Sequence, residues 1–291
     1  MSTDRRTPTD QPLIAPLFHR LIDDAAVFPP GNAALPDAVT AHREHRAAWY
    51  AELVGPLLVP ATSVDALTGL LDPAERLDIG IIGDLPIDRL GVPDDPRVVV
   101  RQIEAAVAKR GEDPQPGLAR VLDLAARQPE IDVYAEIPLT FGLLAGLDTI
   151  ATARASGARV AAKFRTGGLA AELFPTPVEL AAVICACRER ELPFKLTAGL
   201  HHALRHADPE TGFTHHGFLN VLAGTALALD GGEVADVAEL LAAIDAVPLI
   251  EPVRARRHQP RGLWVGFGSC SMIEPLTDLI RLGLVNGGYE G

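Results

Sequence analysis

The chain has 291 residues, of which 48% are hydrophobic and 22% charged, so it fits one large α/β barrel or two small domains and not a globally disordered protein. The formal net charge is −12, and the basic residues form no long block, which argues against nucleic acid or a membrane surface as a partner. No segment resembles a signal peptide or a bilayer-spanning run, and three cysteines do not make a disulfide framework. We therefore expect a cytoplasmic protein.

After a polar tail over residues 1–11, short β-rich runs alternate with helix-patterned segments, which is typical of βα units around a parallel sheet. The predicted strands span residues 20–24, 55–61, 78–83, 97–101, 131–137, 159–165, 193–197 and 263–268. The predicted helices span residues 36–53, 64–71, 102–110, 116–127, 143–156, 178–190, 217–229, 234–244 and 275–284.

Eight strands are the number that a closed barrel needs. We therefore predict a single (β/α)8 TIM barrel over residues 12–291, with an extended loop and helix insertion between the seventh and eighth strands, over residues 199–262. A doubly wound open sheet is the rival architecture. It would need a glycine-rich fingerprint after the first strand, and the sequence has none there.

Lysine is scarce in this chain, since only Lys109, Lys163 and Lys195 are lysines among 26 basic residues. Arginine keeps its proton in proteins, whereas a lysine can become a neutral amine nucleophile. Lys109 lies in an exposed-looking stretch, and we interpret it as a solvated helix end. The other two lie in apolar strands, which makes them the leading candidates for an active centre.

The alternation of side chains along the strands places several charges inside the barrel. Catalytic groups in such barrels come from the C-terminal ends of the strands. Alternation predicts that Glu136, Lys163, Arg165 and Lys195 face one mouth as a paired network, because unpaired buried charges are costly. We expect cationic neighbours and partial burial to lower the pKa of one lysine amine and make it nucleophilic. A salt-bridged layer that only fills the barrel is the alternative.

Two short segments carry a family resemblance. The segment K-F-R-T-G, which begins at Lys163 and includes Thr166, precedes K-L-T-A-G, which begins at Lys195 and includes Thr197. This pair resembles the paired-lysine pattern of deoxyribose-phosphate aldolase and related class I aldolases. The resemblance covers roughly residues 131–202. It implies that Lys163 forms a Schiff base with a carbonyl compound and that Lys195 tunes it electrostatically.

The chain departs from that pattern at three places. Arg165 replaces a small polar residue, and His201 and His202 follow the seventh strand where the family has a glycine-rich phosphate-binding turn. Glu104 is only an approximate match for the acidic residue of the family's fourth strand. Schiff-base chemistry is therefore better supported by the sequence than a phosphorylated substrate.

A histidine-rich loop follows the seventh strand, at the expected catalytic rim. Histidine is the usual acid–base group near neutral pH and the commonest metal ligand. The spacing matches no metal motif. We select His202 or His216 as a proton shuttle, and a polar loop without a catalytic role is the alternative. Five of the nine histidines lie in this stretch: His201, His202, His206, His215 and His216.

Three further rim features are candidates for binding. Asn220 lies at the start of a predicted helix whose free N–H groups are expected to hold a substrate anion. Ser269 lies in a glycine-rich turn after the eighth strand, where barrels commonly bind phosphate or carboxylate. Asp23 and Asp24 end the first strand and could hold a metal or orient a base. A tight turn explains the segment around Ser269 equally well, and a solvated strand end explains Asp23 and Asp24 better than a metal or a base would.

Three functional hypotheses follow. The first is a lyase of aldolase type that acts on a small anionic or carbonyl compound through a lysine imine, without cofactor or metal. The second is a metal-assisted hydrolase or lyase built on Asp23, Asp24, Glu136 and the histidine loop. The third is a noncatalytic barrel that binds an anionic metabolite. The substrate and the oligomeric state stay open, with a homo-oligomer among the options. In the first hypothesis the catalytic residues are Lys163, Lys195, Glu136, His202 and His216, and the substrate-binding residues are Arg165, Thr166, Thr197, His201, Asn220 and Ser269.

Overall fold

The computed structural model of the protein describes residues 13–287, so the predicted tail over residues 1–11 lies outside the described residues. Eight parallel strands form its central sheet: β1 (Ile22–Asp24), β2 (Val54–Pro60), β3 (Leu77–Ile82), β4 (Val98–Ala106), β5 (Asp132–Glu136), β6 (Val160–Arg165), β7 (Phe194–Thr197) and β10 (Trp264–Ser269). The sheet closes into a barrel because β10 pairs with both β7 and β1. The predicted TIM barrel is thereby confirmed.

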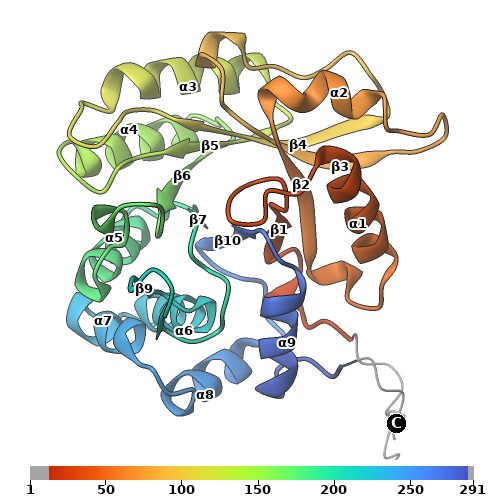
Figure 1. Cartoon of the computed structure of the whole chain (residues 1–291). Helices are drawn as coiled ribbons and strands as arrows, with labels where there is room; N and C mark the ends of the chain where they lie inside the picture. Colours follow the sequence, from red (N-terminus) through yellow and green to blue (C-terminus); the bar gives the residue numbers. More distant parts are fainter. Residues whose placement is uncertain (1–12, 288–291) are drawn as a thin grey trace, which may run out of the picture.

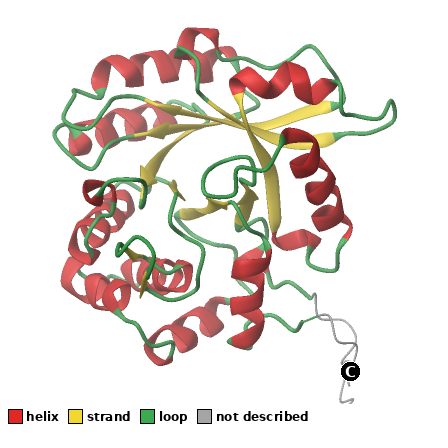
Figure 2. Cartoon of the chain, in the orientation of Figure 1, coloured by secondary structure: helices red, strands yellow, loops and turns green. Residues whose placement is uncertain are grey.

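Helices surround the strands on the outside of the barrel (Figures 1 and 2). They are α1 (Leu35–Ala47), α2 (Val64–Thr68), α3 (Gln115–Arg127), α4 (Leu143–Ala155), α5 (Pro177–Glu189), α6 (Phe218–Leu229), α7 (Val234–Ala242), α8 (Val247–Arg256) and α9 (Ile273–Arg281). The insertion after β7 holds a short antiparallel pair, β8 (His206–Ala207) and β9 (Thr214–His215), followed by α6, α7 and α8. No helix within residues 13–287 is long and apolar enough to span a bilayer.

The predicted helix over residues 102–110 is wrong, because β4 continues to Ala106 and pairs with both of its neighbours. Its outer side chains, such as Ile103, are buried, and its inner side chains Gln102 and Glu104 are buried as well. Polar residues interrupt the apolar run of this strand, which is why its second half resembled a helix. The prediction also missed α8, since Pro248 and Pro252 lie within it.

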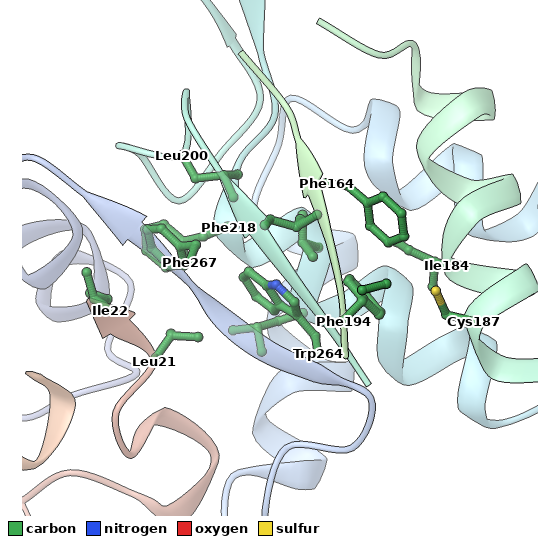
Figure 3. Close-up of a cluster of buried hydrophobic side chains, with 14 of the residues drawn as sticks. Leu21, Ile22, Phe164, Ile184, Cys187, Phe194, Leu200, Phe218, Trp264 and Phe267 are labelled. Carbon is green, nitrogen blue, oxygen red and sulfur yellow. The ribbon is translucent and has the colours of Figure 1, made fainter. Parts of the chain in front are cut away.

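Aromatic side chains on the outer face of the barrel anchor the strands that carry the lysines. Figure 3 shows Phe164 of β6 and Phe194 of β7 beside Ile184 of α5. The two phenylalanine rings lie 6.2 Å apart, and both residues are fully buried. Because successive side chains on a strand point to opposite faces, this packing directs the lysines next to these phenylalanines into the barrel.

The barrel interior holds the aliphatic side chain of Leu58, and glycines leave space for it. A Cβ atom added to Gly80 would lie 2.6 Å from Leu58, and one added to Gly268 would lie 3.1 Å from it. Charged residues of β1 and of β4 to β7 also face the interior, in place of the branched aliphatic side chains that usually fill such barrels.

Candidate active site

Lys163 and Lys195 are cross-strand neighbours in the middle of the barrel, and only 3% and 2% of their surfaces are exposed. Both amines contact Glu104 of β4. Lys195 Nζ lies 2.5 Å from Glu104 Oε1, and Lys163 Nζ lies 2.7 Å from Glu104 Oε2. A single buried carboxylate therefore bridges the two amines.

Two further carboxylates complete the pairing of the lysines. Lys163 Nζ lies 2.8 Å from Glu136 Oε2, and the Nε–H of Arg165 donates to Glu136 Oε1 across 3.1 Å. Lys195 pairs with Asp23 of β1. The network expected from Glu136, Lys163, Arg165 and Lys195 is present, and Asp23 and Glu104 extend it across the barrel.

Gln102 and Tyr134 support the network from the side of Lys195. Gln102 Nε2 donates to Asp23 Oδ2 across 2.6 Å and to Glu104 Oε1 across 2.9 Å. The Lys195 amine lies 5.1 Å from the centre of the Tyr134 ring. Gln102 is not among the predicted site residues because residue 102 falls in a predicted helix. The alternation of Gln102 and Glu104 with buried apolar residues is the signal that could have identified both.

The pKa values of both lysines are raised, which corrects the expectation of a lowered amine pKa. Burial by itself would lower the pKa of Lys163, but the carboxylates of Glu104 and Glu136 outweigh it. For Lys195, burial is outweighed by Asp23 and Glu104. Burial would also raise the pKa of Glu104, yet the two lysines lower it to about 2. Each lysine amine therefore carries its proton at neutral pH.

A cavity of about 160 Å³ adjoins the network at the C-terminal ends of the strands. Glu136, Arg165 and Arg110 line it, and the side chain of Glu136 is 17% exposed. Lys163 lies one hydrogen bond behind Glu136 and does not line the cavity itself.

The loop over residues 25–34 lies among β1, β2 and β10 in the middle of Figure 1. The Ala25 N–H of this loop donates to the carbonyl of Ser269 across 2.7 Å.

The histidine loop forms its own contacts, away from the two amines. His201 Nδ1 lies 3.2 Å from a carboxylate oxygen of Glu274, and His202 Nδ1 lies 3.2 Å from one of Asp278, so both face the α9 segment. The rings of His206 and His215 stack with their centres 5.3 Å apart. None of these histidines has a hydrogen bond to the lysine network within the described residues.

His216 is almost completely buried, and its Nε2–H donates to the carbonyl of Pro175 across 2.7 Å. Burial lowers its pKa to about 4, so the ring is neutral at physiological pH. This environment suits a structural histidine that joins the insertion to the loop before α5. The structure does not bring His216 or His202 beside Lys163, as a proton shuttle to that amine would require.

The threonine and serine candidates bond to neighbouring backbone. Thr166 Oγ1 donates to the carbonyl of Ala198 across 2.6 Å, which ties the ends of β6 and β7 together. Ser269 Oγ donates to the carbonyl of Ser271 across 2.8 Å within its turn. Thr197 follows Lys195 on the inner side of β7 and is partly exposed. Of the predicted substrate-binding residues, Arg165 is the one that lines the C-terminal cavity.

The expectation of a free helix N-terminus at α6 is wrong. The N–H groups of Phe218 and Leu219 donate to the carbonyls of His202 and Ala203. Asn220 is fully buried, and its side chain amide bonds to backbone groups only: it accepts from the Arg205 N–H and donates to the carbonyls of Leu240 and Ala243. These bonds hold the insertion together and leave no amide at this position for an anion.

Asp23 and Asp24 point to different partners, so they do not form the paired-acid site considered from the sequence. Asp24 Oδ2 lies 2.9 Å from Nδ1 of His42 on α1, and both side chains are buried. Asp23 pairs with Lys195 inside the barrel. Within residues 13–287, no group of three or more His, Cys, Asp or Glu side chains is placed to hold a metal ion.

Comparisons of the chain with protein-family models, curated proteins and solved structures found no match.

Proposed function

We propose that the protein is a lyase of aldolase type that acts on a small carbonyl compound through an imine at Lys163. The observation that carries the proposal is the position of the Lys163 amine between Glu104 and Glu136, directly behind the C-terminal cavity. The partly exposed carboxylate of Glu136 lies at the end of the barrel where such enzymes have their active sites, and the buried amine lies one hydrogen bond behind it.

The chemistry begins with the removal of one proton from the Lys163 amine, with Glu136 as the acceptor. The neutral amine adds to the substrate carbonyl carbon, and water leaves as Glu136 returns the proton, so that an iminium ion forms. The substrate hydroxyl on the carbon β to the iminium then loses its proton to Glu136, and the bond between the α and β carbons breaks. Its electron pair moves to the iminium, which becomes an enamine as the first carbonyl product leaves. Glu136 returns the proton to the α carbon of the enamine, which restores an iminium. Hydrolysis then restores the lysine and releases the second product.

The charge balance of the network suits this route. An iminium ion carries the same single positive charge as the ammonium group that it replaces. Glu104 and Glu136 can therefore stabilise both species without leaving a buried charge unpaired, which would cost several kcal/mol. Arg165, beside Glu136 at the cavity, is placed to attract a negatively charged group of the substrate.

The competing interpretation is a noncatalytic barrel, and the burial and protonation of both amines favour it. A metal-assisted reaction has less support, because Asp23, Asp24 and Glu136 are each held by a different cation or histidine. The noncatalytic barrel predicts no covalent adduct with any carbonyl compound.

Reduction with borohydride in the presence of a panel of small aldehydes and ketones separates the two interpretations. We expect the intact mass of the wild-type protein to increase by one reduced adduct. Lys163→Arg keeps the positive charge but cannot form an imine, so it should gain no adduct while retaining its circular dichroism spectrum. Lys109→Arg changes an exposed lysine and serves as the matched control that still reacts. Equal labelling of Lys163→Arg and the wild type would contradict the proposal.

A further inference from the structure

Two histidines face each other across the short hairpin of the insertion, which β8 and β9 form over residues 206–215. His206 and His215 are paired in its antiparallel register, and their rings stack with the centres 5.3 Å apart and the planes 14° from parallel. His202 lies edge-on against His206, with the ring centres 4.8 Å apart. Three imidazole rings therefore pack in one row after the C-terminal end of β7.

The row continues into the wall of the C-terminal cavity. The ring of Phe174 lies edge-on against His215, with the ring centres 5.0 Å apart. Phe174 lies between Leu173 and Pro175, which both line that cavity. The Nδ1–H of His215 also donates to the carbonyl of Gly199 across 3.1 Å. The hairpin thus holds the loop between β6 and α5 against the end of β7.

Hydrogen bonds fix which ring nitrogens of the stack can take up a proton. The Nδ1–H of His206 donates to the carbonyl of Leu204, and that of His215 donates to Gly199. The Nε2 atoms are therefore the ones left to be protonated. A proton on each would place two positively charged rings 5.3 Å apart. Like charges this close oppose each other, so the stack holds one proton more readily than two.

The surroundings of the stack supply little negative charge to offset a second proton. Within the described residues, Asp208 is the one carboxylate at ion-pair distance from either ring, 3.9 Å from His215 Nε2 and partly exposed. Burial and the neighbouring His206 lower the pKa of His215 in spite of this carboxylate. The other charged or titratable neighbours are already paired with one another: Asp278 with His202, Glu274 with His201, and Arg205 with His216.

Opening of the hairpin removes the conflict, because separated histidines each take up a proton. A solvent-exposed histidine with an ordinary pKa of about 6.5 is about nine-tenths protonated at pH 5.5 and about one-tenth protonated at pH 7.5. The extra proton of the open form therefore favours opening about tenfold at pH 5.5 relative to pH 7.5. We propose that the hairpin is a pH-sensitive clamp, which holds the wall of the C-terminal cavity in place at neutral pH and releases it in acid.

Hydrogen–deuterium exchange of the full-length protein, read by mass spectrometry, tests the clamp without any substrate. After correction for the intrinsic pH dependence of exchange, we expect the amides of residues 206–215 and 170–176 to exchange about tenfold faster at pH 5.5 than at pH 7.5. Equal corrected rates at the two pH values, or faster exchange in the hairpin alone, would overturn the proposal. Because no substrate is present, neither outcome bears on the imine at Lys163.

Variants identify the titrating group. His206→Phe keeps an aromatic ring in the stack and removes one titratable group, so its corrected exchange should differ by less than about twofold between the two pH values. His258→Gln changes an exposed histidine outside the hairpin and should keep the difference of about tenfold. A His206→Phe protein that also keeps this difference would assign it to another group, such as His216, and refute the clamp.

Histidine NMR of the wild-type protein is a second test that needs no variant. We expect His206 and His215 to titrate as a coupled pair in two separate steps, with the second step accompanying the faster exchange. A single, independent step for each ring would contradict the repulsion on which the clamp depends.

Discussion

Replacement of Glu104 by glutamine removes the one carboxylate that bridges both lysine amines. The side chain keeps its shape, so the change isolates the charge. Removal of one partner from a buried ion pair destabilises a protein by about 3–5 kcal/mol. The lowering of the pKa of Glu104 from 4.5 to about 2 corresponds to a contribution of about 3 kcal/mol. We therefore expect Glu104→Gln to lower the free energy of unfolding at pH 7 by about 3 kcal/mol.

This contribution has a defined pH dependence. Because the pKa of Glu104 is lower in the folded protein, the unfolded chain takes up the proton first as the pH falls below 4.5. The stabilisation is complete above that pH and is lost progressively down to about pH 2. The difference in unfolding free energy between the wild type and Glu104→Gln should shrink by about 1 kcal/mol between pH 7 and pH 3.5.

Urea unfolding followed by circular dichroism at pH 7, 5 and 3.5 measures both quantities. Glu251→Gln is the matched control, since its side chain is 80% exposed. The control should change the unfolding free energy by less than about 0.5 kcal/mol at every pH. Glu104→Gln could instead lower the free energy of unfolding by less than about 1 kcal/mol at pH 7, or the difference from the wild type could stay constant in acid. Either result would refute a stabilising role of the Glu104 carboxylate between the two lysines.

Two further predictions concern residues that the sequence placed at the catalytic rim. The pKa of His216 is about 4 in the folded protein and 6.5 in the unfolded chain, so the unfolded chain takes up a proton first as the pH falls. The free energy of unfolding of the wild type should therefore decrease by about 2 kcal/mol between pH 7.5 and pH 5. His216→Gln should lack this decrease. Urea unfolding of both proteins at the two pH values checks this, and an identical pH dependence would contradict a buried neutral histidine. Asn220→Ala removes the side chain amide that donates to the partly buried carbonyls of Leu240 and Ala243 and accepts from the Arg205 N–H, and should lower the unfolding free energy by about 3 kcal/mol. A thermally stable Asn220→Ala protein would show that these bonds contribute little.

The barrel was predictable from the sequence because its signals are local. Each strand is a short β-rich run, and eight of them alternate with helical patterns. The same local alternation correctly directed Lys163 and Lys195 inward, since Phe164 and Phe194 occupy the opposite face. The exception was β4, where Gln102 and Glu104 face a polar interior, so the usual apolar signal of a buried strand ends too early.

The electrostatics of the site were not predictable in the same way. Whether a lysine pKa rises or falls depends on how many carboxylates reach it, and these come from distant strands. Asp23 lies 172 residues before Lys195, and Glu104 lies 91 residues before it. The roles of Asn220 and His216 also depend on the packing of the insertion, which no local spacing reveals.

The central claim, an imine at Lys163, is tested most directly by locating the adduct. After reduction with borohydride in the presence of a reactive carbonyl compound, proteolysis and tandem mass spectrometry identify the modified peptide. We expect a single modified lysine, Lys163, in the peptide that contains β6. Modification of Lys195 or Lys109 with Lys163 untouched, or no modified peptide with a compound that the protein turns over, would contradict it.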